Sequence, residues 1–128
     1  MYRVRDVKHN KWIEKGVYLN PIGDLVKIKK GFLRTKEKLL NPSNYEFQYS
    51  TGIKDKNNIL VYEGDIIIAD IMGEEIKTLC VFSDYTCSYV LLDFISNKYY
   101  TLSKDKNRSI KVIGNIYDNK ELMEDNKE

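Results

Sequence analysis

The sequence predicts a mainly β protein, in which a small N-terminal β-hairpin module precedes a barrel-like or sandwich module of five or six antiparallel strands. From position 45 onwards, runs of β-branched and aromatic residues alternate with polar ones and recur about every ten residues. Clusters of Gly, Asn, Asp and Pro separate these runs and are typical of turns. Ten tyrosines stand against four phenylalanines, a bias typical of strands with one hydrated face.

The N-terminal module is predicted over residues 1–44. A polar turn at Asn10 connects its first two strands, since asparagine tolerates positive φ. Residues 32–40 fit a strand, a helical turn or a flexible connection, and the pattern leaves all three open. The boundary after residue 44 coincides with a change in the sign of the net charge along the chain. A single continuous domain is the alternative to two modules. The expected strands are residues 2–7, 12–13, 17–19 and 25–30.

The second module is predicted over residues 45–128. A corner at Gly64 and Asp65 opens a strand that reads as buried on nearly both faces. Gly permits the sharp corner, and the Asp carboxylate can accept hydrogen bonds from nearby backbone amides. The expected strands are residues 45–51, 59–62, 66–69, 76–82, 90–92, 99–102 and 110–116.

Three local features complete this module. Residues 54–58 are expected to form an exposed turn and residues 104–108 a polar loop. Gly114 is expected to bulge or bend the last strand. A short C-terminal helix over residues 120–124 is expected, with Asp118 or Asn119 as its cap.

Composition indicates a globular protein with a single compact core as the simplest arrangement for its 128 residues. The N-terminus lacks the apolar stretch of a signal peptide, and no apolar run approaches the ~20 residues of a membrane span. A cytoplasmic location without membrane contact is therefore expected. Cys80 and Cys87 are expected to be reduced and to act as small strand residues.

Charge is unevenly distributed along the chain. Residues 1–40 carry eleven basic and four acidic residues, a net +7, whereas the rest carries ten basic and fifteen acidic residues, a net −5. This asymmetry fits a basic surface for nucleic acid, a contact between basic and acidic surfaces of two chains, or merely hydrated strand faces. The candidate nucleic-acid contacts are Lys27, Lys29, Lys30, Arg34 and Lys36.

Catalytic and metal-binding groups are scarce. The one histidine, His9, lies in a predicted exposed turn, and one His with two Cys falls short of the four ligands of structural zinc. Glu63 and Asp65 are the remaining pair that could hold a divalent ion or act as acid and base. A hydrogen-bonded structural corner is the competing interpretation of that pair. The sequence thus predicts no catalytic residue, no metal site and no cofactor.

Two runs resemble the YopX family of phage and prophage proteins, namely TGIKDKNNILVYEGDI at residues 51–66 and IKVIGNIYDNKEL at residues 110–122. Residues 3–12 resemble the usual N-terminal sequence of the family more loosely. Asn58 stands where the family often has Gly, in a conformation that both tolerate. The family has no established biochemical activity, so the resemblance implies a fold and a phage setting and transfers no catalytic residue. The structural motif comprises Gly52, Asp55, Tyr62, Glu63, Gly64, Asp65, Gly114 and Asn115.

The leading hypothesis is a phage or prophage accessory protein that acts as a non-enzymatic interaction module and self-associates or binds an unknown phage or host protein. Binding of nucleic acid through the basic N-terminal segment is the alternative. A metal-dependent hydrolase that uses Glu63 and Asp65 is the weaker alternative.

Overall fold

The computed structural model describes residues 2–13, 17–19, 25–30, 35–39 and 41–124. The chain forms two compact units, which we call the N-terminal unit (Tyr2–Gln48) and the C-terminal unit (from Tyr49 onwards). The division falls inside one long strand, β6, that contributes to both.

The N-terminal unit consists of short antiparallel strands. The hairpin β1–β2 pairs Val4 with Ile13 and turns at Asn10, whose φ of 54° confirms the expected left-handed turn residue. Strands β3, β4 and β5 form a three-stranded antiparallel sheet, so the ambiguous segment includes a strand. The elements are β1 (Tyr2–Asp6), β2 (Lys11–Ile13), β3 (Val17–Leu19), β4 (Leu25–Lys30), β5 (Thr35–Leu39) and the 3-10 helix η1 (Pro42–Asn44).

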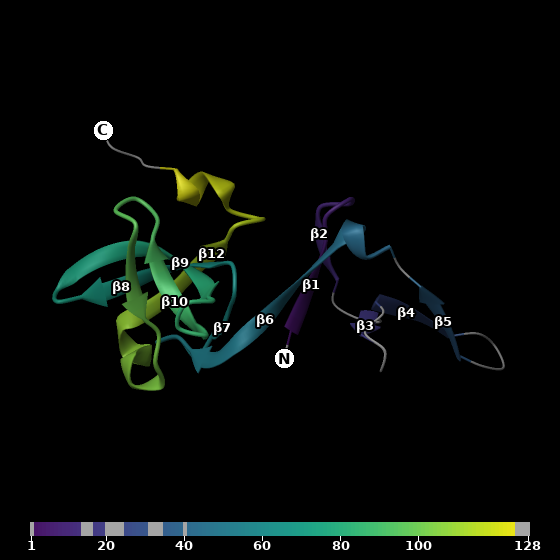
Figure 1. The fold of residues 1–128 in the computed structure, drawn as a ribbon, viewed down its shortest axis with the longest axis horizontal. Helices are drawn as coiled ribbons and strands as arrows, with labels where there is room; N and C mark the ends of the chain where they lie inside the picture. Colours follow the sequence, from purple (N-terminus) through teal and green to yellow (C-terminus); the bar gives the residue numbers. More distant parts are fainter. Residues whose placement is uncertain (1, 14–16, 20–24, 31–34, 40, 125–128) are drawn as a thin grey trace. The chain divides into compact units, whose positions relative to one another are not determined.

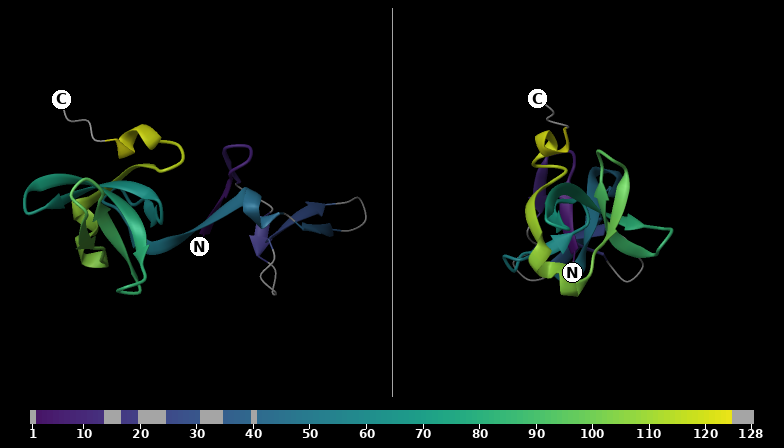
Figure 2. Two further views of the ribbon diagram at one scale, coloured as in Figure 1. Left: turned by 45° about the horizontal axis from the view of Figure 1, so that its top comes forward. Right: turned by 90° about the vertical axis from the view of Figure 1, so that its left-hand side faces the viewer.

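Seven strands follow η1. Figure 1 shows β8, β9, β10 and β12 grouped in the C-terminal unit. Five of the seven strands form an antiparallel sheet in the order β11-β10-β9-β8-β12, and β6 and β7 belong to a four-stranded sheet in the order β2-β1-β6-β7. The curvature of β8 and β9 is visible in Figure 2. The elements are β6 (Tyr45–Lys54), β7 (Leu60–Tyr62), β8 (Asp65–Ile71), β9 (Glu74–Ser83), β10 (Ser88–Asp93), β11 (Lys98–Thr101), η2 (Lys104–Ser109), β12 (Ile110–Asn115) and η3 (Lys120–Met123).

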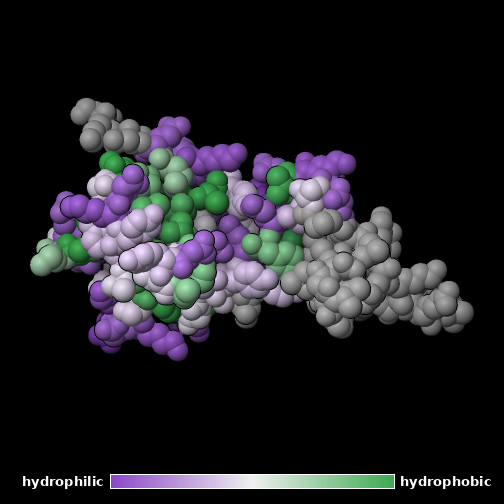
Figure 3. All heavy atoms as spheres, viewed as in Figure 1, coloured by the Kyte–Doolittle hydropathy of each residue, from purple (hydrophilic) through white to green (hydrophobic). Residues whose placement is uncertain are grey.

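The core of the C-terminal unit lies against the five-stranded sheet. Its buried members come from β7, β8, β9, β10 and β12. In β7 and β9 they alternate with half-buried residues, whereas two neighbouring residues of β10 are both buried. Burial is nearly continuous at the start of β8, where Ile66 and Ile67 are fully buried, as predicted. Apolar side chains also reach the surface of this unit in Figure 3. The buried core cluster is Val61, Ile67, Ala69, Cys80, Leu91 and Ile110.

The mainly β fold class is confirmed, but four local predictions need correction. Residues 104–109 form a 3-10 helix where a loop was expected, because the chain turns tightly after Ser103. Strand β6 continues through Gly52 to Lys54, with an irregular register that accommodates the glycine φ of 77°. Cys87 lies in an exposed turn with φ 52° and is no strand residue.

The fourth correction concerns the C-terminal helix, which is a short 3-10 turn. Asn119 occupies its N-cap position, yet its side chain makes no capping hydrogen bond. The Asn119 Oδ1 atom instead accepts a hydrogen bond from the Asn115 amide at 3.2 Å. The Asn119 side chain therefore stabilises the C-terminal end of β12.

Candidate functional site

A pocket of about 370 Å³ opens in the C-terminal unit where the core meets the surface. Its floor includes the core residues Ala69, Leu91 and Ile110, each 2% exposed. Strands β8 and β11 both line the pocket although β9 and β10 separate them in the sheet. The sheet therefore curls around the pocket.

The rim of the pocket combines exposed apolar and polar side chains. Met72 is fully exposed and Tyr99 is 64% exposed, so both present apolar surface to solvent beside the opening. Exposed apolar groups that adjoin a concave apolar site are typical of binding surfaces. The remaining lining residues are Asp70, Ile71, Tyr100, Thr101, Leu102, Lys106 and Ser109.

Charges at the rim are of both signs. The Lys106 ammonium lies 3.4 Å from the Thr101 hydroxyl, a long contact with a neutral partner. The Asp70 carboxylate accepts a hydrogen bond from the Gly73 amide at 3.0 Å. Next to Lys106, a hydrogen bond from the Ser103 hydroxyl lowers the pKa of the Asp105 carboxyl. The positive charge of Lys106, a lining residue of the pocket, also lowers the pKa of the Asp105 carboxyl.

The turn at Met72 and Gly73 breaks a local rule of turn chemistry. Both residues have positive φ, 54° and 84°, in the two-residue connection between β8 and β9. Such turns favour Asn-Gly or Asp-Gly, because a long side chain is disfavoured in the left-handed region. Methionine at this position exposes an apolar side chain at the pocket rim at the expense of turn geometry. Violations of this kind concentrate at functional sites.

Asp55, predicted as part of the structural motif, is 2% exposed. Its Oδ1 accepts hydrogen bonds from the amides of Asn57 and Ile59 at 2.9 and 2.8 Å, and its Oδ2 accepts one from Val112 at 2.9 Å. An exposed turn is predicted for residues 54–58, but the Asp55 carboxylate is buried because it accepts hydrogen bonds from three backbone amides. Asn58, with φ 64°, supplies the expected left-handed residue.

The Gly64-Asp65 corner has the predicted local structure. Gly64 has φ 88°, and Asp65 Oδ2 accepts a hydrogen bond from the Tyr62 amide at 2.8 Å. Asp65 is 2% exposed, whereas Glu63 precedes the strand and is half-buried. Among the residues that the structure describes, no three His, Cys, Asp or Glu side chains are grouped so that they could hold a metal ion.

Gly114 and Asn115 form the predicted irregularity in the last strand. The pairing of β12 with β8 shifts register between Val112 and Gly114, which confirms the bulge. Asn115 Oδ1 accepts hydrogen bonds from the amides of Tyr117 and Asp118 at 3.0 and 2.9 Å. These bonds turn the chain out of the sheet towards η3.

The predicted basic residues lie partly on one ribbon of the N-terminal unit. The β4–β5 register places Lys27 opposite Lys38 and Lys29 opposite Lys36. Because residues two apart share a face of a strand, these four positions belong to one face of the ribbon. Lys30 is opposite Thr35, and Arg34 lies outside the described residues. Lys38 is two residues after Lys36 and so shares its face of the strand, but it is missing from the predicted nucleic-acid contacts.

The Trp12 ring and the His9 imidazole each contact a charged side chain of the N-terminal unit. The guanidinium carbons of Arg3 and Arg5 lie 4.5 and 5.1 Å from the centre of the Trp12 ring. His9 lies in the expected exposed turn, where its Nδ1 is 2.8 Å from the Asp6 carboxylate. The amide of His9 also bonds this carboxylate and is the largest cause of the lowered pKa of Asp6.

Sequence reasoning did not find the pocket. The strand pattern predicts strands for its floor residues and a polar loop for the segment that contains Lys106. The one available signal was Met72 before Gly73, where turn chemistry prefers a short polar residue. No helix among the described segments is long and apolar enough to cross a bilayer.

Comparison with known proteins identifies the family. The YopX protein family model matches residues 1–124. Two solved structures each align with 96% of this chain. Protein EF1440 from Enterococcus faecalis is 24% identical, with a TM-score of 0.59 and 96% of its own chain covered. Protein yopX from Bacillus subtilis is 18% identical, with a TM-score of 0.63 and 97% of its own chain covered. No curated protein matches this sequence. These likenesses show a shared fold, and the family match over almost the whole length shows that the chain belongs to the YopX family.

Proposed function

We propose that this chain is a non-enzymatic interaction module that associates with a second copy of itself, as a phage or prophage accessory protein in the host cytoplasm. The pocket with its exposed apolar rim carries this proposal. Met72 and Tyr99 expose apolar surface beside a concavity floored by core residues. Covering such surface on association is favourable in proportion to the apolar area removed from water.

Two buried carboxylates have structural uses that support a binding role. The Tyr62 amide bonds Asp65, one of the two candidates for chemistry, and three backbone amides bond Asp55 of the structural motif. Carboxylates that satisfy buried amides hold the backbone in place. These two carboxylates therefore stabilise the fold, which leaves the pocket as the surface for recognition.

Sedimentation velocity across the micromolar range and a salt series tests self-association. We expect the weight-average mass to rise above that of the 15.1 kDa monomer as protein concentration increases. If residues 1–40 of one copy, with their net charge of +7, also contact the −5 remainder of another, added salt weakens the association. A monomer at every concentration and every salt level contradicts the proposal.

Nucleic-acid binding by the N-terminal unit is a second candidate, favoured by the β4–β5 register. The register pairs position 27 with 38 and position 29 with 36, so four basic residues occupy neighbouring positions of one ribbon. Several clustered cations of this kind suit the phosphates of a nucleic acid. With four phosphate contacts to a single strand, the logarithm of the binding constant should fall against log salt with a slope of about −3.

Fluorescence anisotropy with a labelled single-stranded oligonucleotide checks this slope. Replacing the four lysines Lys27, Lys29, Lys36 and Lys38 by Gln should abolish binding. A matched control replaces four exposed lysines of the C-terminal unit and lowers the net charge equally, so it separates a local site from general attraction. Equal loss in both variants, or no binding at low salt, counts against this candidate. The control lysines are Lys56, Lys98, Lys104 and Lys120.

A further inference from the structure

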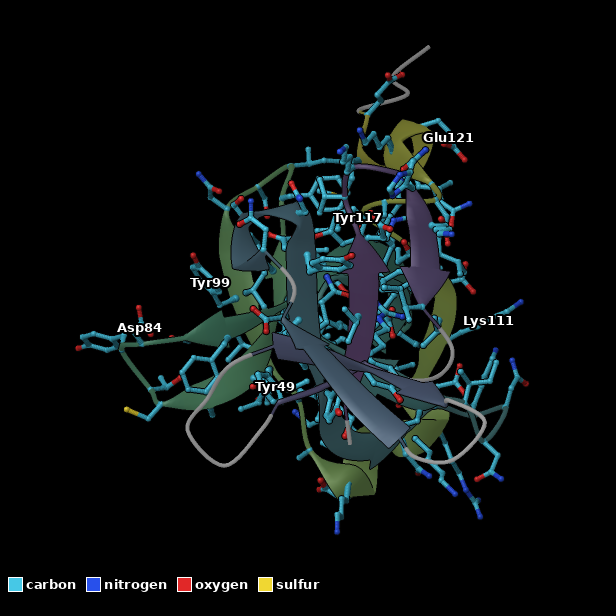
Figure 4. The ribbon with its side chains drawn as sticks, turned by 90° about the vertical axis from the view of Figure 1, so that its right-hand side faces the viewer. Tyr49, Asp84, Tyr99, Lys111, Tyr117 and Glu121 are labelled. Carbon is cyan, nitrogen blue, oxygen red and sulfur yellow. The ribbon has the colours of Figure 1, made fainter. Side chains whose placement is uncertain are left out.

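The tip of the β9–β10 hairpin carries an aromatic side chain for which the fold of the chain gives no reason. Tyr85 is 98% exposed, and Asp84 before it is also exposed. Figure 4 shows Asp84 at the outermost end of this hairpin, well away from the body of the unit. A large ring held fully in water contributes nothing to the packing of its own chain.

The tip is held by its own hydrogen bonds. The Thr86 amide donates to the Ser83 hydroxyl at 3.3 Å, and the hydroxyls of Thr86 and Ser88 lie 2.9 Å apart. Cys87 completes the turn in the left-handed region with φ 52°. A preorganised projection loses less conformational freedom on binding than a flexible one.

We propose that Tyr85 of one copy inserts into the β8–β11 pocket of a second copy, with Asp84 placed against Lys106. This inference rests on the self-association proposed above and specifies its contact. The occupant is thus a second copy of this chain, and the recognised group is an acidic residue followed by an aromatic ring.

The pocket suits one aromatic ring. Its volume of about 370 Å³ is at the lower end of the range for ligand-sized sites, roughly 300–1,000 Å³. Its floor of Ala69, Leu91 and Ile110 is apolar, as a ring face requires, and Thr101 and Ser109 among its lining residues bring hydroxyls that can pair with the phenol group.

Charges at the rim also bear on this contact. The Lys106 ammonium lies 3.4 Å from the Thr101 hydroxyl, and its charge also lowers the pKa of the adjacent Asp105 carboxyl. Asp70, which lines the same pocket, is a like charge for an arriving Asp84, so the proposed pair requires Asp84 to lie on the Lys106 side of the rim. A carboxylate in place of the Thr101 hydroxyl would give a charge-assisted hydrogen bond, which is about twice as strong as a neutral one. Asp84 precedes the inserting ring directly and so reaches the rim when Tyr85 occupies the pocket.

The contact joins two different surfaces, so it is heterologous. Such a contact closes into a ring when its rotation permits and otherwise continues as an open chain. A variant that lacks the tip still offers a pocket, and a variant that lacks the pocket still offers a tip. Mixing the two should therefore give a 1:1 complex that grows no further.

Tyr85→Ala is the first test, with sedimentation velocity of the full chain as the measurement. We expect the dissociation constant to rise more than about tenfold, as is usual when a buried aromatic anchor is truncated. The matched control is Ile95→Ala, which removes a 48% exposed apolar side chain from the next hairpin and should leave association unchanged. Association of Tyr85→Ala at wild-type strength overturns the inference.

Met72→Asn is the second test, and it separates binding from folding. Asparagine suits the left-handed turn, so the melting temperature should rise while the loss of the apolar rim weakens association. Lost association in a more stable protein excludes misfolding as the cause. Unchanged association contradicts a role for the rim.

A charge exchange tests the Asp84–Lys106 pair. Asp84→Lys and Lys106→Glu should each weaken association, and the double variant should restore it. The control Lys111→Glu alters an exposed lysine on β12, which Figure 4 shows on the opposite side of the view from Asp84. If wild type associates but none of these variants changes it, the tip–pocket contact is wrong and self-association stands. If wild type is monomeric, the proposed function itself is wrong.

Discussion

Replacing Asp55 by alanine should lower the free energy of unfolding of the C-terminal unit by about 3–5 kcal/mol, since each buried amide left without its acceptor costs roughly 1–3 kcal/mol. The carboxylate bonds the amides of Asn57, Ile59 and Val112 within a site that is 2% exposed. Water cannot replace these acceptors without opening the turn. Urea unfolding followed by far-UV circular dichroism measures the loss.

The Asp55→Asn variant sharpens this test. Its amide keeps one acceptor oxygen but turns an NH₂ group towards a backbone donor, so we expect an intermediate loss of about 2 kcal/mol. The control Glu75→Gln neutralises an exposed carboxylate on β9 and should change stability by less than about 0.5 kcal/mol. Equal small effects at both positions would refute a structural role for Asp55.

Replacing Gly114 by alanine should destabilise the same unit by about 2 kcal/mol, through overpacking at the bulge. A Cβ atom at this position would lie 2.4 Å from Asn119 Oδ1 and 2.6 Å from its Cγ. The Asn119 side chain cannot retreat without loss of its hydrogen bond to the Asn115 amide.

A double-mutant cycle with Asn119→Gly isolates this clash. In that background, Gly114→Ala should cost only a few tenths of a kcal/mol, because the obstructing side chain is gone. Thermal unfolding of the four proteins supplies the coupling free energy. Additive effects of the two changes would show that the cost has another origin.

Sequence patterns predicted the features that local chemistry decides. Gly64 and Asp65 form a corner, and Asn10 and Asn58 take left-handed turn positions, since each depends on only a few neighbouring residues. The bulge at Gly114 was also predicted, because glycine inside a strand pattern usually marks one.

Features that depend on distant residues were not predicted. Asp55 is buried because its Oδ2 meets the amide of Val112, which is 57 residues away in the chain. The pocket exists because the sheet curls until β8 and β11 both face it, and no local period encodes that curl. The strand pattern also placed Cys87 in a strand, although the chain turns there.

The bond between Asp55 and Val112 has a consequence for synthesis on the ribosome. A nascent chain that ends before β12 holds the carboxylate near Asn57 and Ile59 but lacks its third partner. It also lacks the strand that pairs with β8, so the Ile66–Ala69 stretch would expose one edge. We therefore expect the five-stranded sheet to close only after β12 has emerged, which leaves the β8 edge open to chaperones until then.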